Sequence, residues 1–177
     1  MKEIDAVLII AASEVDSNLY YASRFLAPDP FIFFWERRKG EPGEKFLLMS
    51  DLEIDRAKSE SSVDRVLSYS LYEERAQKKG IERPSLIDVL DQALSERGMR
   101  ALLVPETFPL EYGDRLREKG YLLHTKPEPF FERRAVKSAE ELEHIRETQR
   151  YTEEAVHAAM DVLRRSEIRE DLIYFEG

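Results

Sequence analysis

The sequence predicts an α/β fold: a mixed β-sheet with helices packed on it, followed by one long C-terminal helix. Three observations lead to this prediction. The first half of the chain contains a hairpin pattern, the second half alternates strand, helix and strand, and residues 137–165 hold an unbroken helical pattern. Such elements pack as layers around one core. We therefore expect a domain over residues 1–130 and a linker with a long helix over residues 131–177.

The composition is that of a soluble globular protein. Hydrophobic residues make up 42% of the 177, enough to bury a core, and the net charge of -9 repels phosphate backbones. We therefore expect no nucleic-acid partner. No apolar run is long enough to cross a bilayer, so we expect no membrane partner either. The chain has no cysteine, which excludes disulfides and thiolate metal sites and fits the cytoplasm.

Three apolar segments in the first half read as strands. Residues 6–12 are continuously apolar and rich in Val and Ile, which predicts a strand near the centre of the sheet, covered on both faces. Residues 31–35 and 46–49 flank a charged loop that contains glycine and proline. That arrangement predicts a β-hairpin.

The segment after the hairpin predicts a helix and a strand. Ser50 and Glu53 have the spacing of a capping box, so we expect a short helix to start there. Residues 67, 69 and 71 are Leu, Tyr and Leu, an alternation that predicts a half-buried strand. Residues 73–83 are mostly charged, which indicates a connection.

The second half of the domain alternates helices and strands. Ser85 caps a helix that Gly98 ends, residues 101–104 form a short buried strand, a helix over 109–120 runs from a proline to a glycine, and a strand follows at 121–125. The inward face of the first of these helices consists of Leu86, Val89, Leu90, Ala93 and Leu94. We expect any parallel crossovers to be right-handed.

The last predicted helix is the longest element of the chain. Ser138 and Glu141 form a capping box, and nothing interrupts the helix before Ser166. At 1.5 Å per residue it is about 40 Å long. One face carries Leu142, Ile145, Gln149, Thr152, Val156, Ala159 and Leu163. Because this helix is longer than the domain needs for its own cover, we expect part of its face to meet structure beyond Gly177.

The positions of the histidines in the sequence indicate neither a metal centre nor a catalytic base. Glu141 with His144, and Glu154 with His157, have the Glu-x-x-His spacing of di-metal bundles. Both pairs lie on one helix, roughly 20 Å and about 220° apart, so they cannot share a metal. We interpret them as a solvated face. His124 lies in a predicted strand, where we expect a packed or edge histidine.

Other patterns typical of catalysis are missing as well. Ser13 follows a buried strand but has no G-x-S-x-G around it, and the glycines fit neither a Walker loop nor a dinucleotide turn. Nothing in the chain assembles into an active site.

An aromatic cluster in the first half leaves two interpretations open. Its members are Tyr20, Tyr21, Phe25, Phe31, Phe33, Phe34 and Trp35. Most of them must be core, since large rings gain most from burial. Tyr21, Arg24 and Phe25 precede a proline-rich turn, so some of these rings could instead form an exposed interaction surface.

Two stretches resemble the Xaa-Pro peptidases, the family of prolidases, aminopeptidases P and creatinase. RRAVKSAEELEHIRETQRYTEEAV, at 133–156, is similar to the segment leading into their pita-bread catalytic domain, and the matching residues are Arg134, Lys137, Ser138, Glu141, Ile145 and Arg146. NLYYASRF resembles the N-x-x-Y-L-T-G-F segment after the first strand. It matches at Asn18, Tyr21 and Phe25 and departs at Ala22, Ser23 and Arg24, with Arg24 in place of glycine.

The resemblance implies a fold, a reaction and partners. The fold is the ribonuclease-H-like N-terminal domain of creatinase and prolidase, and the reaction is hydrolysis of the bond before proline. Two divalent metal ions, Mn or Co, would lie in a C-terminal catalytic domain beyond this stretch, so we expect no cofactor, metal or catalytic residue here. The domain would serve a cytoplasmic homodimer and contact its own catalytic domain. Tyr21, Arg24 and Phe25 are our candidates for a wall of the partner subunit's site.

Two other hypotheses belong to different functional classes. The chain could be a stand-alone binding or scaffolding module with this fold and no catalysis, or an unrelated small α/β protein whose long helix dimerises. The reading frame after Gly177 separates the three. Asp, Asp, His, Glu and Glu ligands there indicate a peptidase, a continuation without them indicates a binding module, and a stop codon indicates the small protein.

Overall fold

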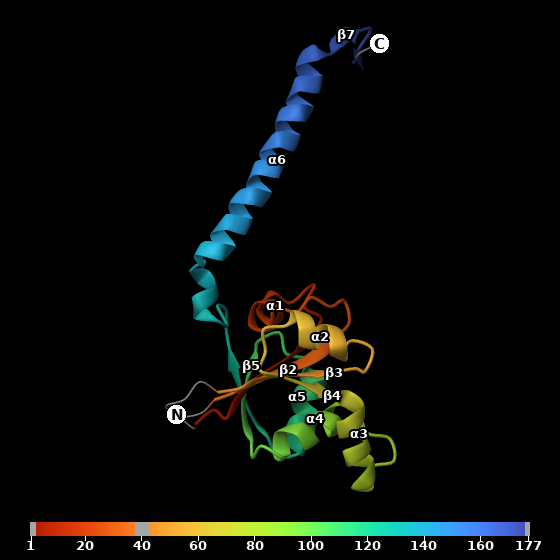
Figure 1. Ribbon diagram of the computed structural model, residues 1–177, viewed down its shortest axis with the longest axis vertical. Coiled ribbons are helices and arrows are strands. Elements are labelled where there is room, and N and C mark those ends of the chain that lie inside the picture. Colours follow the sequence, from red (N-terminus) through yellow and green to blue (C-terminus); the bar gives the residue numbers. More distant parts are fainter. Residues whose placement is uncertain (1–2, 38–42, 176–177) are drawn as a thin grey trace. The chain divides into compact units, whose positions relative to one another are not determined.

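The computed structural model describes residues 3–37 and 43–175 (Figure 1). The chain divides into two compact units, Met1–Phe131 and Glu132–Gly177. The first contains the sheet and the second the long helix.

The first unit is built on a six-stranded mixed sheet in the order β4-β3-β2-β1-β5-β6. Strand β2 runs antiparallel to both of its neighbours, whereas β1 with β5, β5 with β6, and β3 with β4 pair in parallel. The strands are β1 (Ala6–Ala11), β2 (Phe31–Glu36), β3 (Lys45–Met49), β4 (Arg65–Ser68), β5 (Ala101–Pro105) and β6 (Leu122–Lys126). The predicted mixed sheet and central first strand are both confirmed.

Strand β1 is central because both of its faces are buried. Ala6, Leu8 and Ile10 belong to one core cluster, and Val7 and Ile9 belong to the other. Two hydrogen bonds to the Asp5 carboxylate, which we call the aspartate clasp, join the start of this strand to the start of β5. The Asp5 carboxylate accepts the backbone N–H groups of Arg100 and Ala101, both at 2.8 Å.

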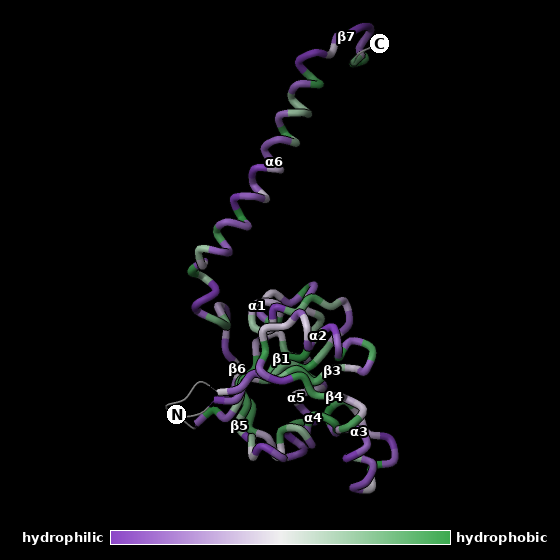
Figure 2. The backbone as a smooth tube through the Cα atoms, in the orientation of Figure 1, coloured by the Kyte–Doolittle hydropathy of each residue, from purple (hydrophilic) through white to green (hydrophobic). Residues whose placement is uncertain are grey.

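Helices cover both faces of the sheet (Figure 1). Helices α3, α4 and α5 contribute to the cluster that contains Leu8, and α1 and α2 contribute to the cluster that contains Ile9. The five helices are α1 (Ser17–Ser23), α2 (Ile54–Glu60), α3 (Tyr69–Lys78), α4 (Leu86–Ser95) and α5 (Leu110–Glu118). Figure 2 shows the strands between them as the most hydrophobic part of this unit.

The predicted hairpin is confirmed as β2 and β3, and it depends on one glycine. A Cβ atom built on Gly43 would lie 1.7 Å from the backbone oxygen of Glu36. The Trp35 indole N–H donates to the Gly43 carbonyl at 3.0 Å. A glycine is required where the two strands approach this closely.

Three predictions between residues 50 and 83 were wrong: the capping box, the charged connection, and the strand at all but Leu67, which lies in β4. Ser50 and Glu53 form no capping box, since α2 begins only at Ile54 and Glu53, its N-cap, makes no side-chain capping bond. Tyr69 and Leu71 are not in a strand. The Ser68 hydroxyl accepts the Leu71 N–H at 3.2 Å and starts α3, which runs through most of the expected connection.

The helices α4 and α5 begin and end as predicted. Ser85 and Asp88 form a complete capping box, and α4 is followed by Gly98 at φ 68°. Pro109 precedes α5 and Gly120, at φ 86°, follows it. These glycines adopt the left-handed conformation that commonly ends helices.

A polar network joins α4 to the end of α5. Lys119 Nζ lies 2.7 Å from the Asp88 carboxylate, and Tyr121 donates to Asp91 at 2.7 Å. Partial burial favours the neutral form of Asp88, but the Lys119 ammonium and the Ser85 hydroxyl and amide outweigh it and hold its pKa at about 2. Burial raises the pKa of Tyr121.

The second unit contains the predicted long helix. After the 3₁₀ helix η1 (Glu132–Ala135), α6 spans Ala139–Arg165, with Ser138 and Glu141 forming both bonds of the capping box. A small hairpin of β7 (Glu167–Arg169) and β8 (Leu172–Tyr174) follows, which the sequence pattern did not reveal. In the described part of the chain, no helix combines the length and hydrophobicity needed to span a bilayer.

Candidate functional site

The three predicted wall residues lie at the end of helix α1: Tyr21 is in its last turn, and Arg24 and Phe25 follow it directly. Asp16 caps its start by accepting the Leu19 N–H at 2.8 Å. Its end is set by Ser23, whose hydroxyl donates to the Leu19 carbonyl at 2.8 Å and accepts the Phe25 N–H at 3.2 Å. Arg24 then turns the chain with φ 54°, in the left-handed region.

Asn18 and Tyr21 lie one helical turn apart and contact the same neighbouring segment. The Asn18 amide donates to a carboxylate oxygen of Glu128 at 2.5 Å, and the Tyr21 ring lies 5.9 Å from the ring of Phe131. The other Glu128 oxygen accepts the Phe130 N–H at 3.0 Å. The N-x-x-Y spacing therefore fastens residues 128–131 to α1.

The three predicted wall residues do not all lie at the surface. Arg24 is exposed, and its guanidinium lies 5.3 Å from the centre of the half-buried Tyr21 ring. Phe25 is 0% exposed, packs edge-on against Phe31 at 5.6 Å and lies under Arg56 at 4.6 Å. Phe25 can therefore support such a wall only from behind, and the wall itself stays a prediction.

Four further residues extend this group, and of these only Trp35 belongs to the aromatic cluster predicted from the sequence. The Trp35 ring lies 6.5 Å from Phe131, with Arg37 at 4.7 Å and Lys45 at 5.5 Å from the indole. Lys45 also donates to the Ala22 carbonyl at 3.3 Å. We call Tyr21, Trp35 and Phe131, together with Arg24, Arg37 and Lys45, the aromatic–cation cluster.

The cluster combines features of surfaces that bind other chains. Its three rings are half-buried rather than hidden, and its three cations lie over them in a chain of net charge -9. Tyr, Trp and Arg are the residue types enriched at interface hot spots. Each cation over a ring contributes about 0.5–1 kcal/mol at an exposed site. The cluster is suited to binding, and the described contacts within it give no nucleophile or general base.

Comparison with known proteins identifies the fold. No protein-family model matches the sequence, and no curated protein matches it. Among solved structures, the X-Pro aminopeptidase from Thermotoga maritima MSB8 matches 95% of this chain and 44% of its own, with a TM-score of 0.70 and 17% identity. The prolidase from Pyrococcus horikoshii OT3 matches 93% of this chain and 40% of its own, with a TM-score of 0.61 and 23% identity.

The matched region is the N-terminal part of these enzymes. The chain has the fold of the Xaa-Pro peptidase N-terminal domain. The prolidase from Pyrococcus furiosus agrees, with a TM-score of 0.59 at 20% identity over 93% of this chain and 41% of its own. The chain spans less than half the length of the three solved structures.

Within this N-terminal-domain fold, the described residues do not fit the divalent metal ions that the resemblance implies. Residues 3–37 and 43–175 contain no group of three or more His, Cys, Asp or Glu side chains that could hold a metal ion. No metal-dependent step follows from this part of the chain.

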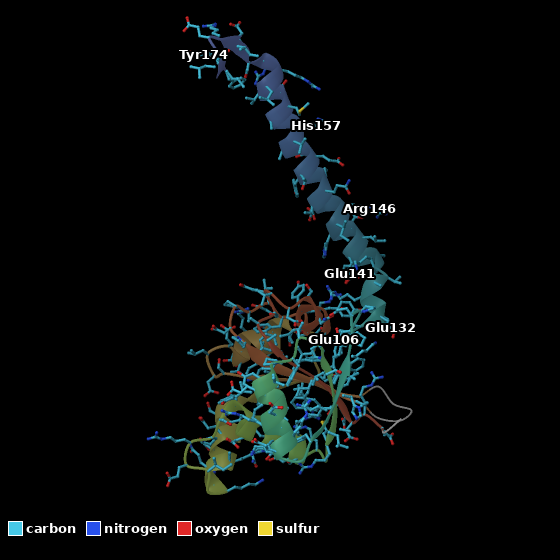
Figure 3. All side chains as sticks on the ribbon, turned by 180° about the vertical axis from the view of Figure 1, so that it is seen from behind. Glu106, Glu132, Glu141, Arg146, His157 and Tyr174 are labelled. Carbon is cyan, nitrogen blue, oxygen red and sulfur yellow. The ribbon has the colours of Figure 1, made fainter. Side chains whose placement is uncertain are left out.

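The three histidines lie on two elements and are well separated along the chain. His124 is on the edge strand β6, as expected, and its buried Nε2 has no hydrogen-bond partner within the described structure. His144 and His157 are on α6. Figure 3 shows Glu141 and His157 well separated along that helix, which agrees with the prediction that the two Glu-x-x-His pairs cannot share a metal.

Proposed function

We propose that this chain is the non-catalytic N-terminal domain of a cytoplasmic, metal-dependent Xaa-Pro peptidase. In the full-length protein it serves dimerisation and forms a wall of the partner subunit's active site. The observation that carries the proposal is the likeness of fold to the N-terminal part of an X-Pro aminopeptidase over 95% of this chain. The chemistry, the hydrolysis of the peptide bond before proline, belongs to the catalytic domain.

Tyr21 and Arg24 are the residues that we assign to the wall. Both are accessible, and they support each other because the guanidinium lies over the ring. Phe25 and Ser23 fix the turn from beneath. A substrate held against this pair would meet a flat aromatic surface with a positive charge at its edge.

The test replaces Arg24 with alanine in the full-length enzyme. We expect kcat/KM on Xaa-Pro substrates to fall about twofold to fivefold, which corresponds to the loss of one cation–ring contact. The matched control is Arg117→Ala on α5, which removes an exposed arginine paired with Asp114. Equal kinetics for the wild type and Arg24→Ala would remove the wall hypothesis.

The stand-alone binding module is the second candidate function, and the aromatic–cation cluster favours it. That cluster is a ready binding surface and needs no catalytic domain to act. The coding sequence after Gly177 distinguishes the two candidates. A continuation that encodes the Asp, Asp, His, Glu and Glu ligands supports the peptidase, and a continuation without them supports the module.

A further inference from the structure

A pocket of about 410 Å³ lies at the carboxyl end of β3, and none of the residues of the aromatic–cation cluster lines it. It is formed by the proline-rich turn before β2, by the loop after β3 and by the first residues of α3 and α4. Its volume is in the range of pockets that hold small molecules. In α/β folds, ligands commonly bind beyond the carboxyl ends of the strands.

The walls of the pocket are mostly apolar. Pro28, Phe31 and Leu48 line it together with Met49 and Leu86. Phe31, Leu48 and Met49 are buried members of the sheet, so this part of the wall is rigid and preformed. Such a surface favours the apolar part of a ligand.

Three polar side chains in the lining, those of Asp29, Ser50 and Tyr69, make no hydrogen bond with any described residue. The Asp29 carboxylate also makes no ion pair with the described part of the chain. Burial first, and then the charges of Glu73 and Asp88, raise the pKa of Tyr69. Tyr69 therefore stays protonated at neutral pH, and its hydroxyl can donate a hydrogen bond to a ligand or accept one from it.

The charge around the pocket is negative. Asp29 and Glu53 line it, and none of the described lining residues is a lysine or an arginine. The nearby Arg56 is shared between two carboxylates, lying 2.6 Å from Glu53 and 3.1 Å from Glu60. This excess of carboxylates disfavours an anion and favours a cation.

We propose that this pocket binds a small organic cation with an apolar body, namely a free arylalkylamine, whose amino group is protonated at neutral pH. The apolar body lies against Phe31, Leu48 and Met49, and the ammonium group lies between Asp29 and the Tyr69 hydroxyl. This site is independent of the proposed peptidase role.

Methionine methyl groups provide a direct test on the 177-residue chain. Of its four methionines, Met49 lines the pocket, Met99 lies in the core on the α4 side, and Met160 lies on α6. The chain, labelled at methionine methyls and assigned with Met49→Leu, is titrated in an NMR experiment with 2-phenylethylamine, 2-phenylethanol and 3-phenylpropionate. We expect the amine to shift the Met49 signal with a Kd of about 1 mM, ordinary for a probe of this size, and to leave Met99 and Met160 unchanged.

The order of the affinities of the three probes tests whether the pocket favours a cation over a neutral molecule and an anion. We expect the amine to bind more tightly than the alcohol, and the alcohol more tightly than the acid. Asp29→Asn should weaken the amine about threefold to fivefold and leave the alcohol unchanged. The matched control, Asp114→Asn on α5, should change neither.

The contribution of the hydroxyl is tested with Tyr69→Phe, which should weaken the amine and the alcohol alike by about fivefold. The exposed Tyr20, changed to Phe, is its control. A Met49 signal that does not move with the amine, or an acid that binds as tightly as the amine, would overturn the proposal. Neither outcome affects the peptidase proposal, which is judged by its own kinetics.

Discussion

Arg24 holds a backbone conformation that arginine rarely adopts. Its φ of 54° lies in the left-handed region, where a Cβ atom crowds the following carbonyl. It also stands at the position where the similar segment of Xaa-Pro peptidases has glycine. The guanidinium contact with Tyr21 offsets part of this conformational cost.

Replacing Arg24 separates these two contributions. Arg24→Ala removes the contact with Tyr21 but keeps the conformational cost of a Cβ atom in the left-handed region. Arg24→Gly removes the contact and also that cost. We therefore expect the glycine variant to be more stable than the alanine variant by about 1 kcal/mol. Chemical denaturation of both variants measures the difference. An alanine variant that is as stable as the glycine variant would show that this turn carries no conformational cost.

Asp88 makes the stability of the first unit depend on pH. Its folded pKa of about 2 lies below the ordinary value of 3.8, so its contribution is fully present above pH 4 and is lost as the pH falls toward 2. The shift corresponds to about 2 kcal/mol. We expect Asp88→Asn to lower the free energy of unfolding by about that amount at pH 7 and to match the wild type near pH 2.

Urea unfolding across this pH range measures the effect of Asp88. Asp114→Asn is the control, because Asp114 forms an exposed pair with Arg117 that contributes little. If the difference between wild type and Asp88→Asn persists at pH 2, the contribution of Asp88 does not come from its charge.

The capping box at Ser138 governs the start of α6. Its hydroxyl accepts the Glu141 N–H at 3.1 Å, and the Glu141 carboxylate accepts the Ser138 N–H at 2.9 Å. We expect Ser138→Ala to destabilise the first turn by about 1 kcal/mol, which raises the exchange rate of the Glu141 and Leu142 amides about fivefold. Hydrogen exchange measures this. Ser166→Ala, at the other end of the same helix, should leave those amides unchanged.

Strong periodicity made most elements predictable from the sequence. Strand β1 has a continuous apolar run, and α4 has an apolar stripe between a serine cap and a glycine. The strand predicted through Leu67, Tyr69 and Leu71 was wrong after Leu67. Three apolar residues at alternate positions also fit the end of a strand followed by the start of a helix. Only Ser68, as an N-cap, marked the change.

The candidate site was predicted only in part, for a physical reason. Tyr21 and Arg24 are three residues apart at the end of one helix, so local pattern could suggest that they meet. Trp35, Lys45 and Phe131 reach the cluster from two strands and the segment after β6. Their meeting depends on the strand order of the sheet, which no local pattern encodes.

At the scale of the whole molecule, α6 carries an exposed apolar stripe. No residue of α6 is buried, and Leu142, Ile145, Val156 and Leu163 are each at least 40% exposed. Exposed apolar surface of this kind favours association. We expect the 177-residue chain to self-associate in sedimentation experiments, and Leu142→Gln with Ile145→Gln to weaken that association.

The matched control for the stripe changes Glu143 and Glu147 to Gln on the opposite face of α6. This variant should associate as the wild type does. A strict monomer at high protein concentration, or equal effects of the two double variants, would contradict a role for the stripe.

The aspartate clasp also limits the order in which the strands can pair while the chain is being synthesised. Asp5 binds the amides of Arg100 and Ala101, and β1 pairs with β5, so the two halves of this contact are separated by almost one hundred residues. A nascent chain on the ribosome can form the β1–β2–β3 meander early, but its first strand keeps one open edge until β5 has been synthesised. Until then that open edge can pair with a strand of a neighbouring polypeptide.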